Sequence, residues 1–274
     1  MNQSSSTDTC QQIKDFWRSI GFFTKLTLVV NLISYLVTNV ALAYGKHGGK
    51  ADFDDISLCP AAVIDSGQYY RLFTSEITHG SPGHIMFNMV TFMLWGTDLE
   101  KYYGTAFYAS VNVVIGIISN FLTIGIQFAQ AYYFPVTVAG CEVGGPRMLL
   151  RCGIGYSNIL FGLMMLEAFM GDDTHRDLFC IKVRKAYIPW IWMVLIQVCI
   201  PQASFIGHLT GIIAALLIKN CGLSFALPKY EWIDSFESSN QGLVSSIDHH
   251  FKYYNASQNQ GDFGISWLAL VYNT

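Results

Sequence analysis

Charged residues are scarce in this chain of 274 residues. They make up 13% of it, about half of the roughly 25% that is usual in soluble globular proteins. No block of like charge occurs and the formal net charge is -3, which argues against a surface that binds nucleic acid. The seven cysteines include no CxxC pair, so neither a zinc ribbon nor a dense disulfide framework is expected. Hydrophobic residues make up 52% of the chain. Together with the low charge, this composition predicts a membrane protein.

Six apolar segments recur along the chain. A helix needs about 20 apolar residues to cross a bilayer, and the last two segments are shorter, so we expect them to thin the bilayer locally or to lie partly inside a bundle. The triplet Ala-Leu-Ala at 41–43 resembles a signal-peptidase site, but the long polar segment before it favours a retained signal anchor. We therefore predict an all-α membrane protein with six transmembrane helices. The segments are Leu26–Tyr44, His84–Tyr103, Thr105–Phe128, Gly153–Gly171, Ala186–Ile200 and Ser204–Ile218.

The distribution of basic residues predicts the orientation of these spans. With the N-terminus in the cytosol, eleven of the 16 Lys and Arg residues fall on the cytosolic side and the other five on the opposite side. The positive-inside rule favours this arrangement, which also places the C-terminus in the cytosol. We thus expect a cytosolic tail over 1–25, a six-span domain over 26–219 and a flexible cytosolic tail over 220–274.

Two features of the non-cytosolic side follow from this orientation. The long loop 45–83 carries an aromatic stretch at 69–73, which is typical of short helices at a membrane interface. Cys59, Cys141 and Cys152 all fall on this side, so a disulfide among them is possible in an oxidising lumen. The sequence leaves the pairing open.

Four polar residues lie near the non-cytosolic ends of three different spans. Intramembrane polar groups are costly and indicate functional sites by default. His84 and Asn88 are four residues apart and share one helix face, while Ser157 and His208 lie near the starts of two other spans. Each has an ordinary explanation when taken alone, as a backbone-bonded serine, a core histidine or an interhelical amide. Their common depth favours a shared site.

The residue types at this depth suit nucleophilic catalysis. A serine hydroxyl needs a base within hydrogen-bond reach, and a neutral imidazole serves as that base near pH 7. No carboxylate lies at this depth in either span, so we predict a Ser157–His208 dyad and not a triad. His84, the Asn88 amide and the Ser157 backbone N–H are the candidate donors to an oxyanion.

Small residues predict close packing around this pair. Gly207 and Gly211 form a small-xxx-small face on the last span, and Gly153 and Gly155 precede the serine on its own span. Such residues let two helix backbones approach. We therefore expect these glycines to bring Ser157 and His208 together.

The motifs, taken in order, resemble those of the rhomboid intramembrane serine proteases. The similarity is greatest to the six-span eukaryotic rhomboid-related type of the early secretory pathway, and it covers residues 70–215. The set is specific as a whole, although each motif alone is weak. The matching residues are Tyr70-Arg71, His79, His84-Ile-Met-Phe-Asn88, Glu100, Gly104, Gly155-Tyr-Ser157, Phe161 and Gly207-His208-Leu-Thr-Gly211.

The resemblance implies a role for each motif. Ser157 would be the nucleophile and His208 the general base, with Phe161 packed against the His208 ring. His84 and Asn88 would stabilise the oxyanion. It further implies no cofactor, a place in the lipid bilayer of the ER or another secretory-pathway membrane, and transmembrane substrates with helix-destabilising segments. Structural or gating roles would fall to Arg71, His79 and Glu100.

Two departures keep other functions open. Asn158 follows the serine where many family members have glycine, so a catalytically silent rhomboid-like protein that binds membrane clients is the main alternative. The loop 130–152 is long for a connection into the catalytic helix, and we expect it to shape access of water or substrate.

A transporter or channel is less favoured, because the polar groups do not continue through the membrane. A metal site at His79 and His84 is weaker still. The two residues are five apart, so they would not share a helix face, and no third ligand is evident.

Overall fold

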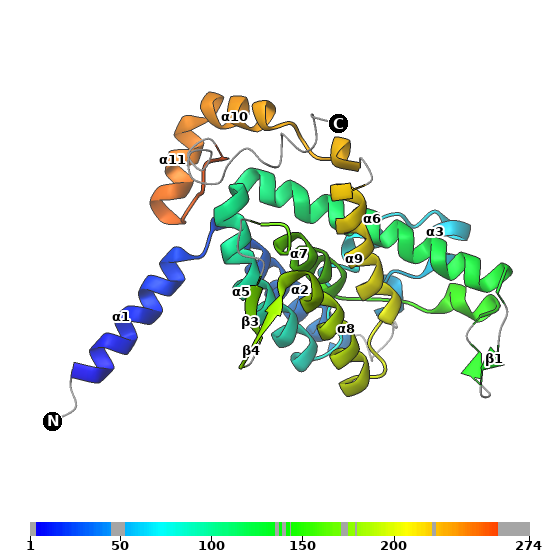
Figure 1. Ribbon diagram of the computed structural model, residues 1–274. Coiled ribbons are helices and arrows are strands. Elements are labelled where there is room, and N and C mark those ends of the chain that lie inside the picture. Colours follow the sequence, from blue (N-terminus) through cyan, green and yellow to red (C-terminus); the bar gives the residue numbers. More distant parts are fainter. Residues whose placement is uncertain are drawn as a thin grey trace. The chain divides into compact units, whose positions relative to one another are not determined.

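The computed structural model describes residues 4–44, 53–134, 137–138, 141–142, 144–170, 175–178, 180–220 and 223–256. The chain forms two compact units, which we describe separately. The terminal unit combines Met1–Val29, Val90–Val111 and Ser224–Thr274, and the central unit combines Val30–Met89 and Asn112–Leu223. Figure 1 labels the elements of both.

Helices dominate the terminal unit. Three long helices, α2, α5 and α6, run from one unit into the other, and only part of each belongs here. Gly104 separates α5 from α6. Its φ of 81° is left-handed and interrupts the helix, and few residues other than glycine adopt this conformation. The elements are α1 Ser4–Ser19, α2 Phe22–Tyr44, α5 Pro82–Tyr103, α6 Thr105–Tyr132, η5 Leu223–Ala226, α10 Tyr230–Ser239 and α11 Gln241–His250.

Glu100 is the polar centre of the terminal unit. One carboxylate oxygen accepts hydrogen bonds from the Phe23 N–H at 2.9 Å and the Thr105 hydroxyl at 2.8 Å. The other accepts from the backbone N–H and the hydroxyl of Thr24, at 2.8 and 2.7 Å. This buried side chain therefore caps the start of α2, whose first N–H groups have no partner within the helix.

The C-terminal segment is ordered where we expected a flexible tail. Within 220–274 the structure describes residue 220, which ends α9, and residues 223–256, which form η5, α10, α11 and an extended strap at 251–255. The strap pairs with distant parts of the chain, because Lys252 O accepts from Phe22 N at 2.7 Å and Tyr254 O accepts from Thr105 N at 2.7 Å. Sequence reasoning missed these long-range backbone bonds because the segment lacks a long apolar run. Residues 257–274 lie outside the described part.

The central unit contains the remaining elements. The loop 45–83, called the first loop below, carries two short helices, α3 and α4. We predicted such helices for the aromatic stretch at 69–73 and its surroundings. Pro60 starts α3 and a left-handed Gly67 ends it, which is the usual placement of these two residues. The elements are η2 Phe53–Asp55, α3 Pro60–Ser66, α4 Arg71–Thr74, β1 Thr137–Val138, β2 Cys141–Glu142, η3 Pro146–Leu150, α7 Ser157–Glu167, β3 His175–Leu178, β4 Ile181–Arg184, η4 Lys185–Tyr187, α8 Ile188–Cys199 and α9 Phe205–Asn220.

The apolar helices differ in length. By length and composition, two helices can cross a membrane, over Phe22–Val40 and Thr105–Tyr132, among the residues described. Three apolar helices are shorter: Ser157–Glu167, Lys185–Cys199 and Phe205–Asn220.

One predicted boundary is wrong. We expected the span that holds the serine to begin at Gly153, which would put Ser157 a turn inside it, but α7 begins at Ser157 itself.

Helix α7 is the core of the central unit. Every residue from Asn158 to Glu167 is buried, which is expected of a helix that is apolar on all sides. It packs most extensively against α9, whose buried residues include His208, Gly211 and Ile212. The nucleophile candidate thus is the first and only partly exposed residue of a helix that is otherwise enclosed by protein.

Candidate active site

Ser157 and His208 face each other across α7 and α9. The Nε2 atom of His208 lies 3.1 Å from the Ser157 hydroxyl oxygen, which is hydrogen-bond distance. His208 is buried, and Ser157 is partly exposed at the first position of α7. The two residues are 51 positions apart in the sequence, so their contact is a product of the fold.

An aromatic ring packs against His208. The ring of Phe161 stacks on the imidazole, with centroids 4.4 Å apart and planes 28° apart. The Nδ1 atom of His208 has no hydrogen-bond partner among the described residues. A catalytic triad would place a carboxylate at that nitrogen. The geometry is that of a Ser–His pair held by an aromatic ring.

The segment before Ser157 is extended and bonded to the first loop. Gly153 and Leu58 exchange two backbone hydrogen bonds, of 2.9 and 3.1 Å, and the Gly155 N–H donates to Ser75 O at 2.8 Å. Gly155 has φ of 111°, a conformation that strongly favours glycine. These bonds explain why the helix starts only at Ser157, since the residues before it pair in the manner of a β-bridge.

His84 lies against this extended segment. A Cβ atom at Gly155 would lie 2.6 Å from His84 Nε2, so the imidazole occupies the space that a side chain there would need. Asn88 lies one turn further along α5, and its amide nitrogen donates to His84 O at 2.8 Å. The structure thus brings His84 next to residues 152–156, which precede Ser157 and are called the serine segment below. The Asn88 amide, in contrast, bonds to its own helix.

His79 is closer to His84 than helix periodicity suggested. Their rings lie 4.9 Å apart in an edge arrangement, because His79 belongs to the loop before α5. Burial and the neighbouring His84 lower the pKa of His79 to about 4, so this residue is neutral at neutral pH. A packed neutral imidazole of this kind supports the position of His84.

The close approach of α7 and α9 occurs at Gly211. A Cβ atom there would lie only 1.9 Å from Asn158 O, so the two backbones are in direct contact. The prediction that Gly153 and Gly207 also let the two helices approach is wrong. A Cβ atom at Gly153 would meet nothing within 4 Å, and one at Gly207 would meet only Ser204. Gly211 therefore sets the spacing that brings Ser157 and His208 within reach.

Arg71 organises the first loop. Its side chain is buried and donates to Gln68 Oε1 at 2.7 Å, to Ser57 O at 2.8 Å and to the backbone oxygen of Asp54. Hydrogen bonds from a charged donor are stronger than neutral ones. Arg71 thereby fixes the loop that pairs with the serine segment.

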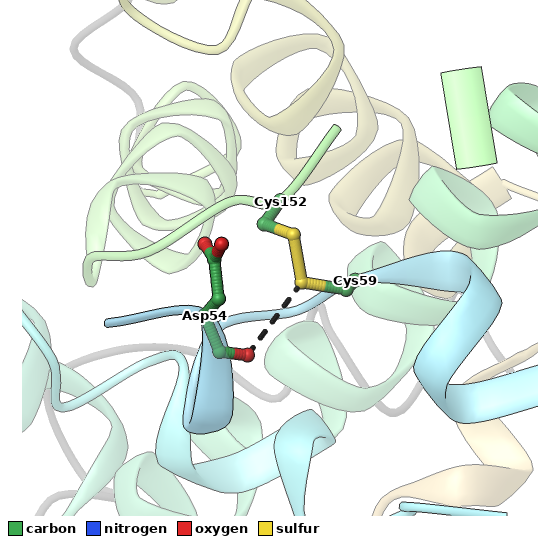
Figure 2. A group of neighbouring side chains, drawn as sticks. All are labelled: Asp54, Cys59 and Cys152. Carbon is green, nitrogen blue, oxygen red and sulfur yellow. Dashed lines mark hydrogen bonds between the residues drawn. A yellow bond between two sulfur atoms is a disulfide. The ribbon is translucent and has the colours of Figure 1, made fainter. Parts of the chain in front are cut away.

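A disulfide joins the same two segments. Cys59 at the start of α3 bonds to Cys152, five positions before the serine, as Figure 2 shows. One of the three pairings left open by the sequence is thus present, and the Cys141 side chain lies outside the described residues. Asp54 contributes a third donor atom within 4.8 Å of the two sulfur atoms, but sulfur atoms joined in a disulfide are not thiolate ligands for a metal.

Sequence reasoning missed the residues that surround Asn158. Its amide lies among Glu76, Ser119 and Asn120, all of them buried. A lone carboxylate shortly before an apolar span was the available signal, since such a group is rarely buried without a partner. The long loop 130–152 is described only in part, as a hairpin of β1 and β2 followed by η3.

Comparison with known proteins identifies the family of this architecture. Residues 66–225 match the family model described as "Rhomboid domain". The chain is similar to "Rhomboid-like protein 15" of Arabidopsis thaliana, with 26% identity over 230 residues that cover 84% of this chain and 54% of that protein. It is also similar to "Rhomboid-related protein 4" of Rattus norvegicus, with 29% identity over 150 residues that cover 54% of this chain and 44% of that one.

A further relative carries an enzymatic name. "Rhomboid-type serine protease 2" of Debaryomyces hansenii is 25% identical over 263 residues, which cover 92% of this chain and 79% of that protein. The chain spans about half the length of the first two relatives.

Proposed function

Because the chain belongs to the rhomboid family, whose fold is a helical membrane fold, we propose that it is an intramembrane serine protease with Ser157 and His208 as its catalytic dyad. The observation that carries this proposal is the 3.1 Å separation between His208 Nε2 and the Ser157 hydroxyl oxygen. The serine-protease name of the Debaryomyces hansenii relative agrees with it. No cofactor is needed for this chemistry.

The reaction follows from the proton positions available to the pair. His208 accepts the hydroxyl proton of Ser157 as the serine oxygen attacks the carbonyl carbon of the scissile peptide bond. The tetrahedral intermediate collapses when His208 returns the proton to the leaving amine, and an ester to Ser157 remains. His208 then deprotonates a water molecule that attacks the ester. As the second intermediate collapses to the acid product, His208 gives this proton to the Ser157 oxygen, which restores both residues.

The negative charge of the intermediate needs fixed donors. Ser157 is the first residue of α7, so its backbone N–H is among those without a partner inside the helix, and the positive end of the helix dipole lies there. His84 lies against Gly155, two residues before. Asn88 would supply its amide after a rotation away from the His84 carbonyl oxygen.

The site is suited to substrates that lie in the bilayer. We propose six spans, with both tails in the cytosol and the catalytic pair near the luminal surface of an ER or other secretory-pathway membrane. The Cys59–Cys152 disulfide supports a luminal position for that side, since such bonds persist in oxidising compartments. Substrates would be transmembrane helices that unwind readily, because a helical peptide bond keeps its carbonyl in a hydrogen bond.

A serine-directed fluorophosphonate tests the dyad. The purified wild-type protein should be labelled, and both Ser157→Ala and His208→Ala should abolish labelling and the cleavage of a model transmembrane substrate. Labelling that survives Ser157→Ala would remove this serine from the mechanism. A properly folded wild type that neither labels nor cleaves would instead favour the silent client-binding protein.

A substituted-cysteine accessibility scan tests the membrane arrangement. A reagent that cannot cross the membrane should reach position 176 from the cytosolic side and position 147 from the luminal side. Luminal labelling of position 176 would contradict the six-span orientation, and fractionation of the expressing cells would test the assignment to the secretory pathway.

A further inference from the structure

A buried polar cluster adjoins the nucleophile and has no role in the proposed chemistry. It joins the first loop to the catalytic helix within the central unit. Glu76 comes from the loop after α4, Ser119 and Asn120 come from the middle of α6, and Asn158 comes from the first turn of α7. All four side chains are buried, with at most 7% of each residue exposed. Burial of a carboxyl group beside the catalytic serine requires an explanation, because such groups are costly to remove from water.

The Asn158 amide, whose nitrogen carries two hydrogens, lies within hydrogen-bond distance of three acceptors. Its nitrogen lies 2.7 Å from Glu76 Oε1, 2.8 Å from the Ser119 hydroxyl oxygen and 3.1 Å from Asn120 Oδ1. Its oxygen accepts the Ile159 N–H at 2.8 Å, which caps one of the first N–H groups of α7. Both ends of the amide are therefore bonded, and the side chain has one orientation.

Glu76 is in turn fixed from α6. Its Oε1 atom accepts a second hydrogen bond, from the Asn120 amide at 2.6 Å, and the same amide nitrogen donates to Leu72 O at 2.9 Å. Burial raises the pKa of Glu76 to about 8, so the carboxyl group is neutral at neutral pH. A glutamine at this position would keep the Oε1 acceptor.

Asn158 is also held through its backbone. Its carbonyl oxygen lies against Gly211 of α9, three residues after His208. Any shift of Asn158 would therefore move the adjacent Ser157 and press on the helix that carries His208. The distance between the two reacting atoms depends on this residue from both sides.

We propose that Glu76 and Asn158 are a positioning pair, which fixes the start of α7 so that the Ser157 hydroxyl stays within reach of His208. The pair contacts neither the substrate nor the reacting atoms. This inference deepens the proposed function and rests on it for its catalytic consequence. It also gives Asn158, which stands where the family resemblance implies a glycine, a function of its own: the side chain connects the nucleophile to the first loop.

The first test compares three single variants with the wild type. Glu76→Leu and Asn158→Ala should lower both kcat and the rate of fluorophosphonate labelling at least 10-fold, with KM changed less than 2-fold. Glu76→Gln should stay within 3-fold of the wild type, because its amide oxygen replaces the acceptor. Thr78→Val is the matched control, since the Thr78 hydroxyl is buried in the same loop and bonds only within it, to Thr74 O.

The double variant Glu76→Leu/Asn158→Ala separates a pair from two independent residues. If the two residues act together, the kcat of the double variant should be no lower than that of the slower single variant. A loss of kcat equal to the product of the two single losses would show that they act independently and would contradict the proposal. A Glu76→Leu protein that keeps wild-type kcat and labelling and loses only thermal stability would show that the cluster merely supports the fold.

A readout that needs no proteolysis distinguishes failure of this inference from failure of the proposed function. In a Ser157→Cys background, the rate of thiol alkylation at position 157, measured against the parent chain, reports the setting of that side chain. Adding Glu76→Leu should change this rate at least 5-fold, and adding Glu76→Gln should not. An unchanged rate rejects the positioning pair whether or not the protein is a protease, and a changed rate in a protein without hydrolytic activity rejects the protease alone.

Discussion

The imidazole of His208 is held between the Ser157 hydroxyl and the ring of Phe161. The hydroxyl oxygen lies at hydrogen-bond distance from His208 Nε2, and the Phe161 ring stacks on the imidazole and so fixes its plane. Because no partner for Nδ1 occurs among the described residues, the orientation of the base depends on packing. A serine protease with a triad assigns that task to a carboxylate.

Loss of this stack should reduce turnover without unfolding the protein. An aromatic pair contributes about 0.5–1.5 kcal/mol beyond its buried area, so Phe161→Leu should lower kcat about 2- to 10-fold. Phe92→Leu is the matched control, since Phe92 is equally buried and belongs to the terminal unit. Steady-state cleavage of a model substrate by the two variants provides the measurement, and equal losses in both would contradict a specific role for the stack.

The buried carboxyl group of Glu76 predicts a pH dependence of stability. Its pKa is raised from 4.5 to about 8 by burial, and the side chains bonded to it are Asn120 of α6 and Asn158 of α7, neither of which titrates. Because the pKa of Glu76 is higher in the folded than in the unfolded protein, the neutral carboxyl group contributes to the free energy of unfolding. This contribution is fully present below pH 4.5 and is lost as the pH rises through 8. Above pH 8 the free energy of unfolding is lower by at most about 5 kcal/mol.

The variant Glu76→Gln should therefore unfold less readily than the wild type at pH 8 and similarly at pH 4.5. Thermal unfolding in detergent across this range provides the comparison. Parallel pH profiles for the two proteins would show that Glu76 does not titrate in this window.

At the scale of elements, the contact of α7 with α9 determines whether the dyad forms. Gly211→Ala would place a Cβ atom 1.9 Å from Asn158 O, and a backbone atom cannot yield without moving its helix. We expect at least a 10-fold loss of activity and about 1–3 kcal/mol of destabilisation from overpacking.

Gly125→Ala is the control for that substitution. A Cβ atom there meets nothing within 4 Å, so activity should be unchanged. Cleavage rates and unfolding temperatures of both variants decide the matter, and full activity of Gly211→Ala would show that the two helices have room to adjust.

The sequence predicted the helices better than their starting points. Each of the six apolar runs contains a helix in the described part of the chain, although only two helices there are long and apolar enough to cross a membrane. The depth of Ser157 and His208 within these runs suggested their contact. The start of α7 was wrong because backbone bonds from Gly153 and Gly155 to the first loop decide it, and local sequence does not report such long-range partners. The Glu76–Asn158 bond was missed for the same reason, since its two residues are 82 positions apart.

At the scale of the whole molecule, one covalent bond joins the first loop to the serine segment. Cys59 and Cys152 close a loop of 93 residues, and in the chain-entropy account a loop of this size contributes about 4 kcal/mol or somewhat more. Cys59→Ser should lower the thermal stability of the oxidised protein substantially, and reduction of the wild type should have the same effect.

Cys199→Ser serves as the control, because Cys199 is free and exposed. It should leave the unfolding temperature and its response to reductant unchanged. A wild-type protein whose unfolding temperature ignores reductant would show that the disulfide is absent in the folded molecule.

The strap at 251–255 also has a consequence for biosynthesis. It bonds to the N–H groups of Phe22 and Thr105, so the beginning and middle of the terminal unit lack these partners until translation has passed Tyr254. At 5–20 residues per second, Thr105 would wait roughly 7–30 s for its partner. A nascent chain would thus contain Ser157 and His208, the pair proposed as catalytic, well before this unit is complete, and a truncated product would expose unpaired amides that quality-control factors could recognise.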